Sequence, residues 1–301
     1  MAFTAQALTL AQNYQKELAQ AYPYMLKFGK LYQSASNSLY NWTGADTIKI
    51  PSITTSGRVD SNRDTIATAQ RNYNNSWKTL TLENQRKWST LVHPMNIDQS
   101  NFTASIVNIT KVYNETQKFP EMDAYCISKT FADWIALGKT ADTTVLDEAT
   151  ILSRFDKMME DMDEARVPIE GRVLYVTPSV KTMLKHASQV TRQITTDGKN
   201  DGVIKREVNR LDEVEIISVS SDLMKTAYDF TSGWTPAVGS KQIHMVLIAP
   251  DAVITPVSYQ TVKLDEPSAV TEGKYIYFEE SFEDVFVLPH KADAIKFVTA
   301  A

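Results

Sequence analysis

The side chains that could act as nucleophiles or metal ligands are few and lie far apart along the chain. There is one cysteine, Cys126, and there are four histidines, His93, His186, His244 and His290. A thiolate metal site needs several ligands at close spacing, and a nucleophilic cysteine needs a histidine partner. Cys126 lies within an apolar helical pattern, where a single cysteine usually fills the core. These residues therefore predict no catalytic group and no metal site.

A short acidic run, Glu160, Asp161, Asp163 and Glu164, is the remaining candidate for binding a cation. On a helix, Glu160 and Glu164 share one face while Asp161 points elsewhere, so the four carboxylates do not converge. The run is typical of a solvated helix face. The sequence contains no glycine-rich phosphate loop, no GxSxG elbow and no HExxH motif. We therefore expect no cofactor and no enzymatic activity.

Composition narrows the class of protein further. The chain has 301 residues, 43% hydrophobic and 22% charged, which is the balance of an ordinary globular protein. Lys and Arg total 31 against 36 Asp and Glu, so the formal net charge is -5. A freestanding nucleic-acid-binding protein usually carries a basic excess. The sequence also lacks an apolar run of the ~18 residues that span a bilayer and a basic secretory leader. We expect no membrane partner.

The first element that the sequence predicts is an amphipathic helix near the start of the chain. Phe3, Ala7, Leu10, Tyr14 and Leu18 recur at spacings of four, three, four and four, which places them on one face. This stripe has two interpretations. The helix either docks on its own domain or forms an arm that docks on a neighbouring subunit, with Phe3, Leu10 and Tyr14 as its contacts.

The stretch from Ala45 to His93 is extended and polar. Ile48, Ile50 and Ile53 alternate with polar residues, as in an edge strand, and two more strand-like stretches follow a polar segment. No cluster within this stretch can form its own core, and such long insertions are uncommon unless they bind something. We expect a projecting β-hairpin that a partner covers, with its cations forming ion pairs between subunits. Its candidate intersubunit contacts are Arg71, Trp77, Lys78, Arg86 and Trp88.

The remainder of the chain mixes helices and strands. Helical spacing begins at Ile97, where Asp98 and Ser100 are candidate N-caps, and the pair Phe119-Pro120 interrupts or kinks the element. Two more helices follow, one over residues 121–138 and one over 147–167. A buried strand over 172–176, a helix opened by Pro178 and several strands complete the chain.

This order of elements resembles the major capsid proteins of tailed bacteriophages, the Hong Kong 97 lineage. The resemblance covers essentially the whole chain. FPEMDAYCISKTFADW is similar to a proline-glutamate-x-aspartate-alanine-tyrosine stretch seen in many of these proteins. The other matching segments are IDQSNFTASIVN, VPIEGRVLYVTPSVKTMLKHA, GVIKREVNRLDEVEIISVSSDLM, IHMVLIAPDAVITPV and VFVLPHKADAIKFV.

The resemblance implies an α+β, Hong Kong 97-like fold in four parts. These are an N-terminal arm (1–44), an extended β-hairpin loop (45–95), a peripheral domain with a long spine helix (96–172 and 241–301) and an axial α/β domain (173–240). It also implies a homo-oligomer of pentamers and hexamers that closes an icosahedral shell around double-stranded DNA without sequence-specific binding. The expected partners are a separate scaffolding protein and a portal, and the expected location is the virion, assembled in the host cytoplasm. The lysine–asparagine crosslink of the founding member has no matched residues here, and Lys78 is only a loose candidate.

Two other classes of protein remain open at this stage. An encapsulin-like nanocompartment shares the fold but encloses an enzyme, and the neighbouring genes would distinguish it from a capsid. A cytosolic α/β enzyme with an unrecognised site would instead form a small oligomer, with a pocket of convergent ionisable groups.

Overall fold

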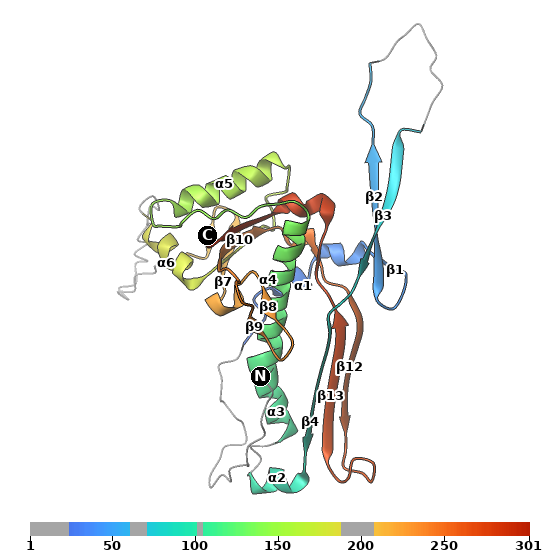
Figure 1. The fold of residues 1–301 in the computed structure, drawn as a ribbon. Helices are drawn as coiled ribbons and strands as arrows, with labels where there is room; N and C mark the ends of the chain where they lie inside the picture. The colour runs from blue at the N-terminus through green and yellow to red at the C-terminus, as the bar shows by residue number, and fades with distance from the viewer. Residues whose placement is uncertain (1–23, 61–70, 101–104, 188–207) are drawn as a thin grey trace, which may run out of the picture.

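The computed structural model describes residues 24–60, 71–100, 105–187 and 208–301. Within these ranges the chain forms a layered α/β unit, a long three-stranded sheet beside a long helix, and a hairpin that extends away from both (Figure 1). The expected contacts Phe3, Leu10 and Tyr14 lie outside the described residues, so their role stays a prediction.

The α/β unit is built on a five-stranded sheet in the order β15-β10-β5-β7-β6. β5 pairs with β7 in parallel, and the other neighbours are antiparallel. All four residues of β5 are buried, which is the pattern of a strand covered on both faces. The strands are β5 (Val173–Val176), β6 (Arg210–Leu211), β7 (Val214–Ser218), β10 (Ile243–Ile248) and β15 (Ile295–Thr299).

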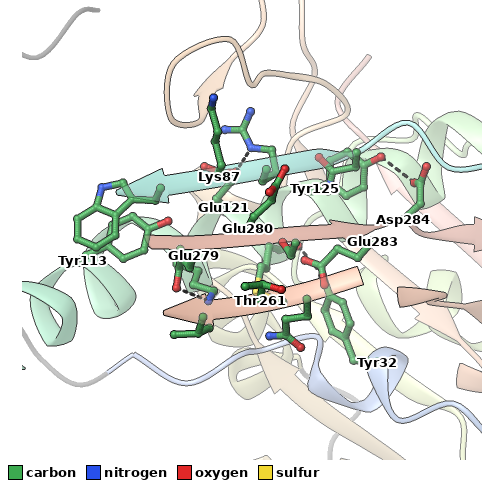
Figure 2. A pocket seen from close by; sticks show the side chains of 18 of the residues that line it. Tyr32, Lys87, Tyr113, Glu121, Tyr125, Thr261, Glu279, Glu280, Glu283 and Asp284 are labelled. Atoms are coloured by element: carbon green, nitrogen blue, oxygen red, sulfur yellow. Dashed lines mark hydrogen bonds and ion pairs between the residues drawn. The ribbon is translucent and has the colours of Figure 1, made fainter. Parts of the chain in front are cut away.

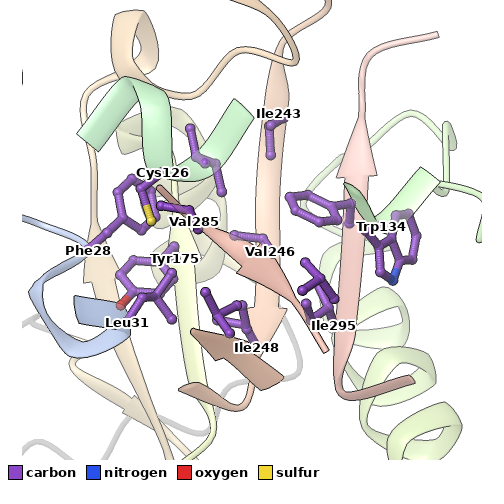
Figure 3. Close-up of a cluster of buried hydrophobic side chains, with 14 of the residues drawn as sticks. Phe28, Leu31, Cys126, Trp134, Tyr175, Ile243, Val246, Ile248, Val285 and Ile295 are labelled. Carbon is purple, nitrogen blue, oxygen red and sulfur yellow. The ribbon is translucent and has the colours of Figure 1, made fainter. Parts of the chain in front are cut away.

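Helices cover the two faces of this sheet. Side chains of a strand alternate between its faces, so Val173 and Tyr175 pack toward α4 (Phe119–Ala136), while Leu174 and Val176 pack toward two other helices. Figure 3 shows the first of these clusters, in which Cys126 and Trp134 of α4 meet the sheet. The helices on the second face are α5 (Ile151–Glu164) and α6 (Pro178–His186).

The domain division implied by the resemblance needs revision at residue 241. β10 and β15 follow that position, yet they lie in the same sheet as β5. The segment IHMVLI of β10 is almost wholly buried and therefore needs strands on both sides and helices on both faces. The α/β unit accordingly includes strands from 241–301 as well as from 173–240.

A long helical stretch connects the α/β unit to the long sheet. It runs without a break through α3 (Ile106–Tyr113), a π-helical segment η2 (Asn114–Lys118) and α4. At Phe119-Pro120, where an interruption or a kink was expected, the helical stretch continues. The π-helical segment ends at Lys118 and α4 begins at Phe119, so the proline lies where the hydrogen-bonding pattern changes and not within a regular α-helix. Among the helices of the described residues, none is both long and apolar enough to cross a membrane.

The N-caps expected for this stretch are also wrong. Asp98 lies inside a separate short helix, α2 (Pro94–Gln99), and Ser100 is the C-cap of α2. Ser105 caps α3 instead, and its side chain accepts a hydrogen bond from the Asn108 amide at 3.4 Å. Ser100 and Ser105 therefore cap two different helices.

The long sheet has the strand order β12-β13-β4, with antiparallel pairing throughout. β4 was expected to belong to the extended loop 45–95, but it pairs with β13 and not with the hairpin. A two-stranded pair, β11 with β14, links the sheet to the rest of the molecule. The bounds are β4 (Gln85–Val92), β11 (Val253–Ile254), β12 (Val257–Asp265), β13 (Tyr275–Glu283) and β14 (Phe286–Val287).

The predicted projecting hairpin is present and consists of β2 (Thr47–Thr55) and β3 (Tyr73–Thr81). At its base, Ile48 and Ile50 are buried in a small cluster of apolar side chains that includes Ile254 of β11 and Phe286 of β14. The outer halves of both strands are exposed (Figure 1). The base therefore anchors the hairpin, and the rest extends away from the chain's own core. A short strand, β1 (Asn41–Trp42), pairs with the base of β2.

Residues 24–38 do not behave as a free arm. Phe28 and Leu31, at and within α1 (Gly29–Tyr32), are fully buried in the main core. The arm predicted over 1–44 is therefore too long, since burial of two large apolar side chains ties this segment to its own chain. The remaining short elements are β8 (Tyr228–Asp229), β9 (Thr235–Pro236) and the 3-10 helices η1 (Ala35–Ser38), η3 (Ser221–Leu223), η4 (Pro250–Ala252) and η5 (Pro289–Ala294).

Candidate assembly surfaces

One face of the hairpin carries large apolar side chains that the described part of the chain leaves uncovered. In the β2–β3 register, Trp77 faces Pro51 and Tyr73 faces Thr55, with Ile53 between them. Paired residues project to the same side of a sheet, so Trp77, Tyr73 and Ile53 share one face, opposite the anchoring isoleucines. Their exposed fractions are 52%, 55% and 69%. We call these three residues the hairpin face.

The hairpin also carries uncompensated positive charge. Lys49, Arg58, Arg71 and Lys78 lie on or beside its strands, and none forms an ion pair with another described residue. The Arg71 guanidinium makes only a 3.5 Å contact with the Asn74 carboxamide and a cation–π contact with Tyr73, with 5.9 Å to the ring centroid. These cations are available to acidic groups of another molecule.

Arg86 and Trp88, the other two expected contacts, have partners within the chain. The Arg86 Nε donates to Glu121 Oε1 at 2.6 Å, and its Nη1 donates to the Phe230 carbonyl at 2.7 Å. The Trp88 indole stacks on Tyr113, with 3.8 Å between ring centroids (Figure 2). Their assignment as intersubunit contacts depended on placing β4 in the hairpin. The pairing of β4 with β13 turns both side chains toward the long helix and removes that basis.

A cleft between the long sheet and the helix contains convergent ionisable groups, as an enzyme site would (Figure 2). Several of these groups bind one another. Lys118 Nζ lies 3.0 Å from Glu279 Oε2, and the Tyr277 hydroxyl donates to the same carboxylate at 3.0 Å. Burial and Glu279 together raise the pKa of Tyr277 to about 12. Together with the Arg86–Glu121 pair, this network joins the sheet to the helix.

Glu283, in the same cleft, provides a test of its electrostatics. Burial raises the pKa of its carboxyl, Lys118 lowers it, and the nearby Asp284 and Glu121 raise it. Because the folded chain holds this proton more tightly than the unfolded chain, stability is lost as the pH rises through the raised pKa. We expect Glu283→Gln to be more stable than wild type at neutral pH, with a difference that shrinks as the pH falls toward the ordinary pKa of glutamate.

Denaturant unfolding at a series of pH values measures this difference. Glu266→Gln is the matched control, because it removes one carboxylate at an exposed position directly after β12 of the same sheet. A Glu283→Gln profile parallel to that of wild type at every pH would contradict the assignment.

The core interpretation of Cys126 is confirmed. Its side chain is fully buried, and burial raises the pKa of the thiol far above its ordinary value, which disfavours the nucleophilic thiolate. Within the described ranges, no group of three or more His, Cys, Asp or Glu side chains is arranged to hold a metal ion.

The acidic run on α5 lies on a charged helix face, as expected. Lys157 Nζ lies 2.9 Å from Glu160 and 3.1 Å from Asp161, and Asp163 binds the buried Arg172 guanidinium at 2.6 Å. Glu160 and Asp161 therefore share Lys157, while Asp163 binds a different cation, and the described carboxylates of this run form no common metal site.

Asp123 is an important residue that the sequence patterns did not single out. It lies on the buried face of α4 with Ile127, Thr130 and Trp134, at spacings of four, three and four. Its side chain is fully buried and accepts three hydrogen bonds from residues 24–28. The sequence did contain one signal for this residue: Asp123 is a charged residue that lies at helical spacing with the apolar residues of the buried face.

Comparison with solved structures identifies the fold. Solved structures that resemble this one include bacteriophage capsid and head structures, and the similarity extends over nearly the whole chain. The chain therefore has the capsid fold of tailed bacteriophages, the α+β, Hong Kong 97-like fold that the resemblance predicted.

Three of these structures illustrate the match. A structure from Mycobacterium phage Che8 has 14% identity and a TM-score of 0.66 over 98% of both chains. The bacteriophage PhiM1 mature capsid has 11% identity and a TM-score of 0.64 over 97% of this chain and 92% of the other. The head of Helicobacter pylori bacteriophage KHP40 has 10% identity and a TM-score of 0.63 over 97% and 94%. Comparisons with protein-family models and with curated proteins give no match.

Proposed function

We propose that the protein is the major capsid protein of a tailed bacteriophage. Its copies form pentamers and hexamers and close an icosahedral shell around double-stranded DNA. The observation that carries the proposal is the hairpin face of Trp77, Tyr73 and Ile53, which the described chain leaves uncovered in a fold shared with phage capsid structures. A second copy of the chain would cover that face.

Charge supports the same arrangement. The hairpin carries Lys49, Arg58, Arg71 and Lys78, none of which forms an ion pair with another described residue, whereas the end of the long sheet exposes acidic groups that include Asp265 and Glu266. Opposite charges steer association and set the register between subunits. The hairpin of one subunit would thus lie over the acidic sheet of the next, in contact sets above ~2,000 Å², the range of obligate interfaces.

The shell would work with other components of the virion. We expect a separate scaffolding protein during assembly in the host cytoplasm and a portal at one vertex. The net charge of -5 leaves no basic excess for tight phosphate binding. Closure of the shell, and not sequence-specific contact, would therefore retain the DNA, and no catalytic step is needed.

Negative-stain microscopy and light scattering of the overexpressed protein test the proposal. We expect closed shells, or rings of five and six copies that close when scaffolding protein is added. A compact monomer under all salt and scaffold conditions would refute it. The contents of particles purified from the host separate a capsid from a nanocompartment, since the former holds DNA and the latter a protein cargo.

A further inference from the structure

One short stretch of α4, residues 121–125, binds three separate parts of the chain. Glu121 binds Arg86 of β4, Asp123 binds residues 24–28, and Tyr125 binds Asp284 at the end of the long sheet. Successive side chains of a helix point in different directions, so a little more than one turn can reach elements on several sides.

Asp123 holds the segment that follows residues 1–23. Its Oδ2 accepts the Tyr24 hydroxyl at 2.5 Å and the Lys27 amide at 2.8 Å, and its Oδ1 accepts the Phe28 amide at 3.1 Å. The carboxylate is fully buried, so each of these hydrogen bonds is shielded from water. The Tyr32 hydroxyl adds a bond to the Met122 carbonyl at 3.0 Å. Asp123 thus fixes residues 24–28 against the main core.

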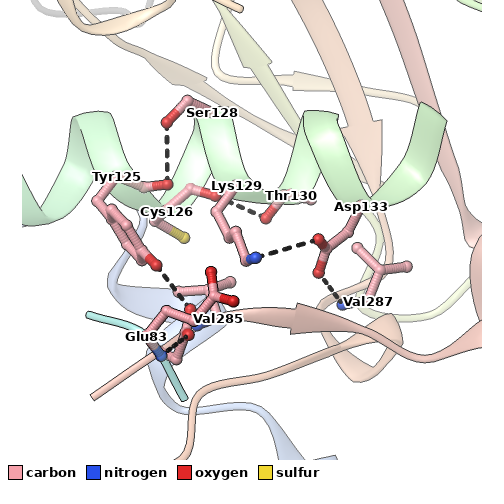
Figure 4. A network of polar contacts seen from close by, with 10 residues as sticks. Glu83, Tyr125, Cys126, Ser128, Lys129, Thr130, Asp133, Val285 and Val287 are labelled. Atoms are coloured by element: carbon pink, nitrogen blue, oxygen red, sulfur yellow. Dashed lines mark hydrogen bonds and ion pairs between the residues drawn. The ribbon is translucent and has the colours of Figure 1, made fainter. Parts of the chain in front are cut away.

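Tyr125 holds the base of the hairpin through one intermediate residue. Its hydroxyl donates to Asp284 Oδ1 at 2.7 Å, and Asp284 Oδ2 accepts the Glu83 amide at 2.9 Å (Figure 4). Glu83 lies in the link between β3 and β4, where the hairpin meets the long sheet. Asp284 is itself almost fully buried. One buried carboxylate therefore connects the Tyr125 hydroxyl to the base of the hairpin.

We infer that Asp123 and Tyr125 are positioning residues for assembly. One helical turn fixes the starting points of both segments that were expected to reach neighbouring subunits. The inference rests on the proposed function, because it assigns these residues to the placement of intersubunit contacts. Their hydroxyl and carboxylate bonds orient the two segments before any second copy binds, which lowers the ordering cost of association.

Three variants that each remove one hydroxyl group test the inference. Tyr24→Phe removes a donor to Asp123, and Tyr125→Phe removes the donor to Asp284. Ser128→Ala is the matched control, because the Ser128 hydroxyl bonds only to carbonyls of its own helix. Asp123→Asn perturbs the same site more strongly than Tyr24→Phe does. The asparagine side chain would place N–H donors against the Tyr24, Lys27 and Phe28 donors that the carboxylate accepts from.

Amide hydrogen exchange of the unassembled full-length chain is the first readout. We expect exchange about tenfold faster at Lys27 and Phe28 in Tyr24→Phe, and at Glu83 in Tyr125→Phe, because a lost bond to a charged group releases its neighbours. Shell yield under assembly conditions is the second readout. It should fall severalfold in both variants, while Ser128→Ala matches wild type in both measurements.

The two readouts distinguish failure of the positioning role from failure of the proposed function. Unchanged exchange in both tyrosine variants would overturn the positioning role. Faster local exchange with a normal shell yield would show that this positioning does not serve assembly, and would overturn the inference as well. A wild-type chain that forms no shells would instead refute the proposed function, whereas the exchange data would still report the local bonds.

Discussion

Replacement of Trp134 by alanine is expected to lower the free energy of unfolding by about 3–5 kcal/mol, the usual cost of truncating a buried tryptophan. Trp134 is 2% exposed and lies between α4 and the sheet of the α/β unit. Its ring centroid is 5.2 Å from that of Phe297, and its Nε1 donates to the Ala292 carbonyl at 3.0 Å. The substitution leaves a cavity and an unpaired carbonyl in the main core.

Denaturant unfolding of the unassembled chain measures this loss. Trp134→Phe is the informative companion, because it keeps most of the apolar volume and removes the hydrogen bond to Ala292. We expect it to retain a substantial part of the stability that Trp134→Ala loses. A midpoint for Trp134→Ala within error of wild type would contradict the placement of this side chain in the core.

Replacement of Trp77 by alanine is expected to affect assembly and not the stability of the unassembled chain. The unfolding midpoint of the unassembled chain should stay close to that of wild type, since the indole is 52% exposed on the hairpin and covers no core of its own. Shell yield should fall strongly, or the shells should disassemble at lower temperature. An aromatic anchor contributes about 2 kcal/mol or more at an interface, and a closed shell repeats the contact in every copy.

Asn75→Ala is the matched control for this prediction. Asn75 lies on the same face of β3, paired with Ile53, and is exposed, but it lacks a large apolar side chain. We expect its shell yield to match that of wild type. If Trp77→Ala lowered the unfolding midpoint as much as Trp134→Ala does, the hairpin would pack on its own chain, and the intersubunit role of the hairpin face would be wrong.

Local periodicity was enough to predict most of the individual elements. The spacing of apolar residues places Trp134 and Cys126 in the buried part of α4. Alternation predicts a strand through Ile48, Ile50 and Ile53, of which the first two are buried while Ile53 lies on the opposite, exposed face. These patterns can be read from the sequence because side chains return to the same face of an element at a fixed period, about 3.6 residues in a helix and two in a strand. The projecting hairpin was predicted from a different local feature, a long polar stretch that contains no cluster able to form its own core.

Whether a candidate contact residue stays exposed on its own chain was only partly predictable from the sequence. Trp77 and Lys78 lie on an exposed hairpin whose strands are neighbours in the chain, so their surroundings follow from nearby sequence. Arg86 and Trp88 looked similar in the sequence, but their side chains face Glu121 and Tyr113 of the long helix. Nothing in the residues around Arg86 indicates which distant element will lie across from it.

The arrangement of elements depends on pairings between segments far apart in the chain. β4 joins β13, and Gln85 and Glu280, which are 195 positions apart, lie within hydrogen-bond distance. Likewise, β10 and β15 enter the sheet of β5, and residues 24–28 bind Asp123. A strand's alternation specifies which face is buried but not which edge it pairs with, because its backbone N–H and C=O groups are the same for every partner. The partner is selected by the fit of whole faces in the folded core, which no local window contains.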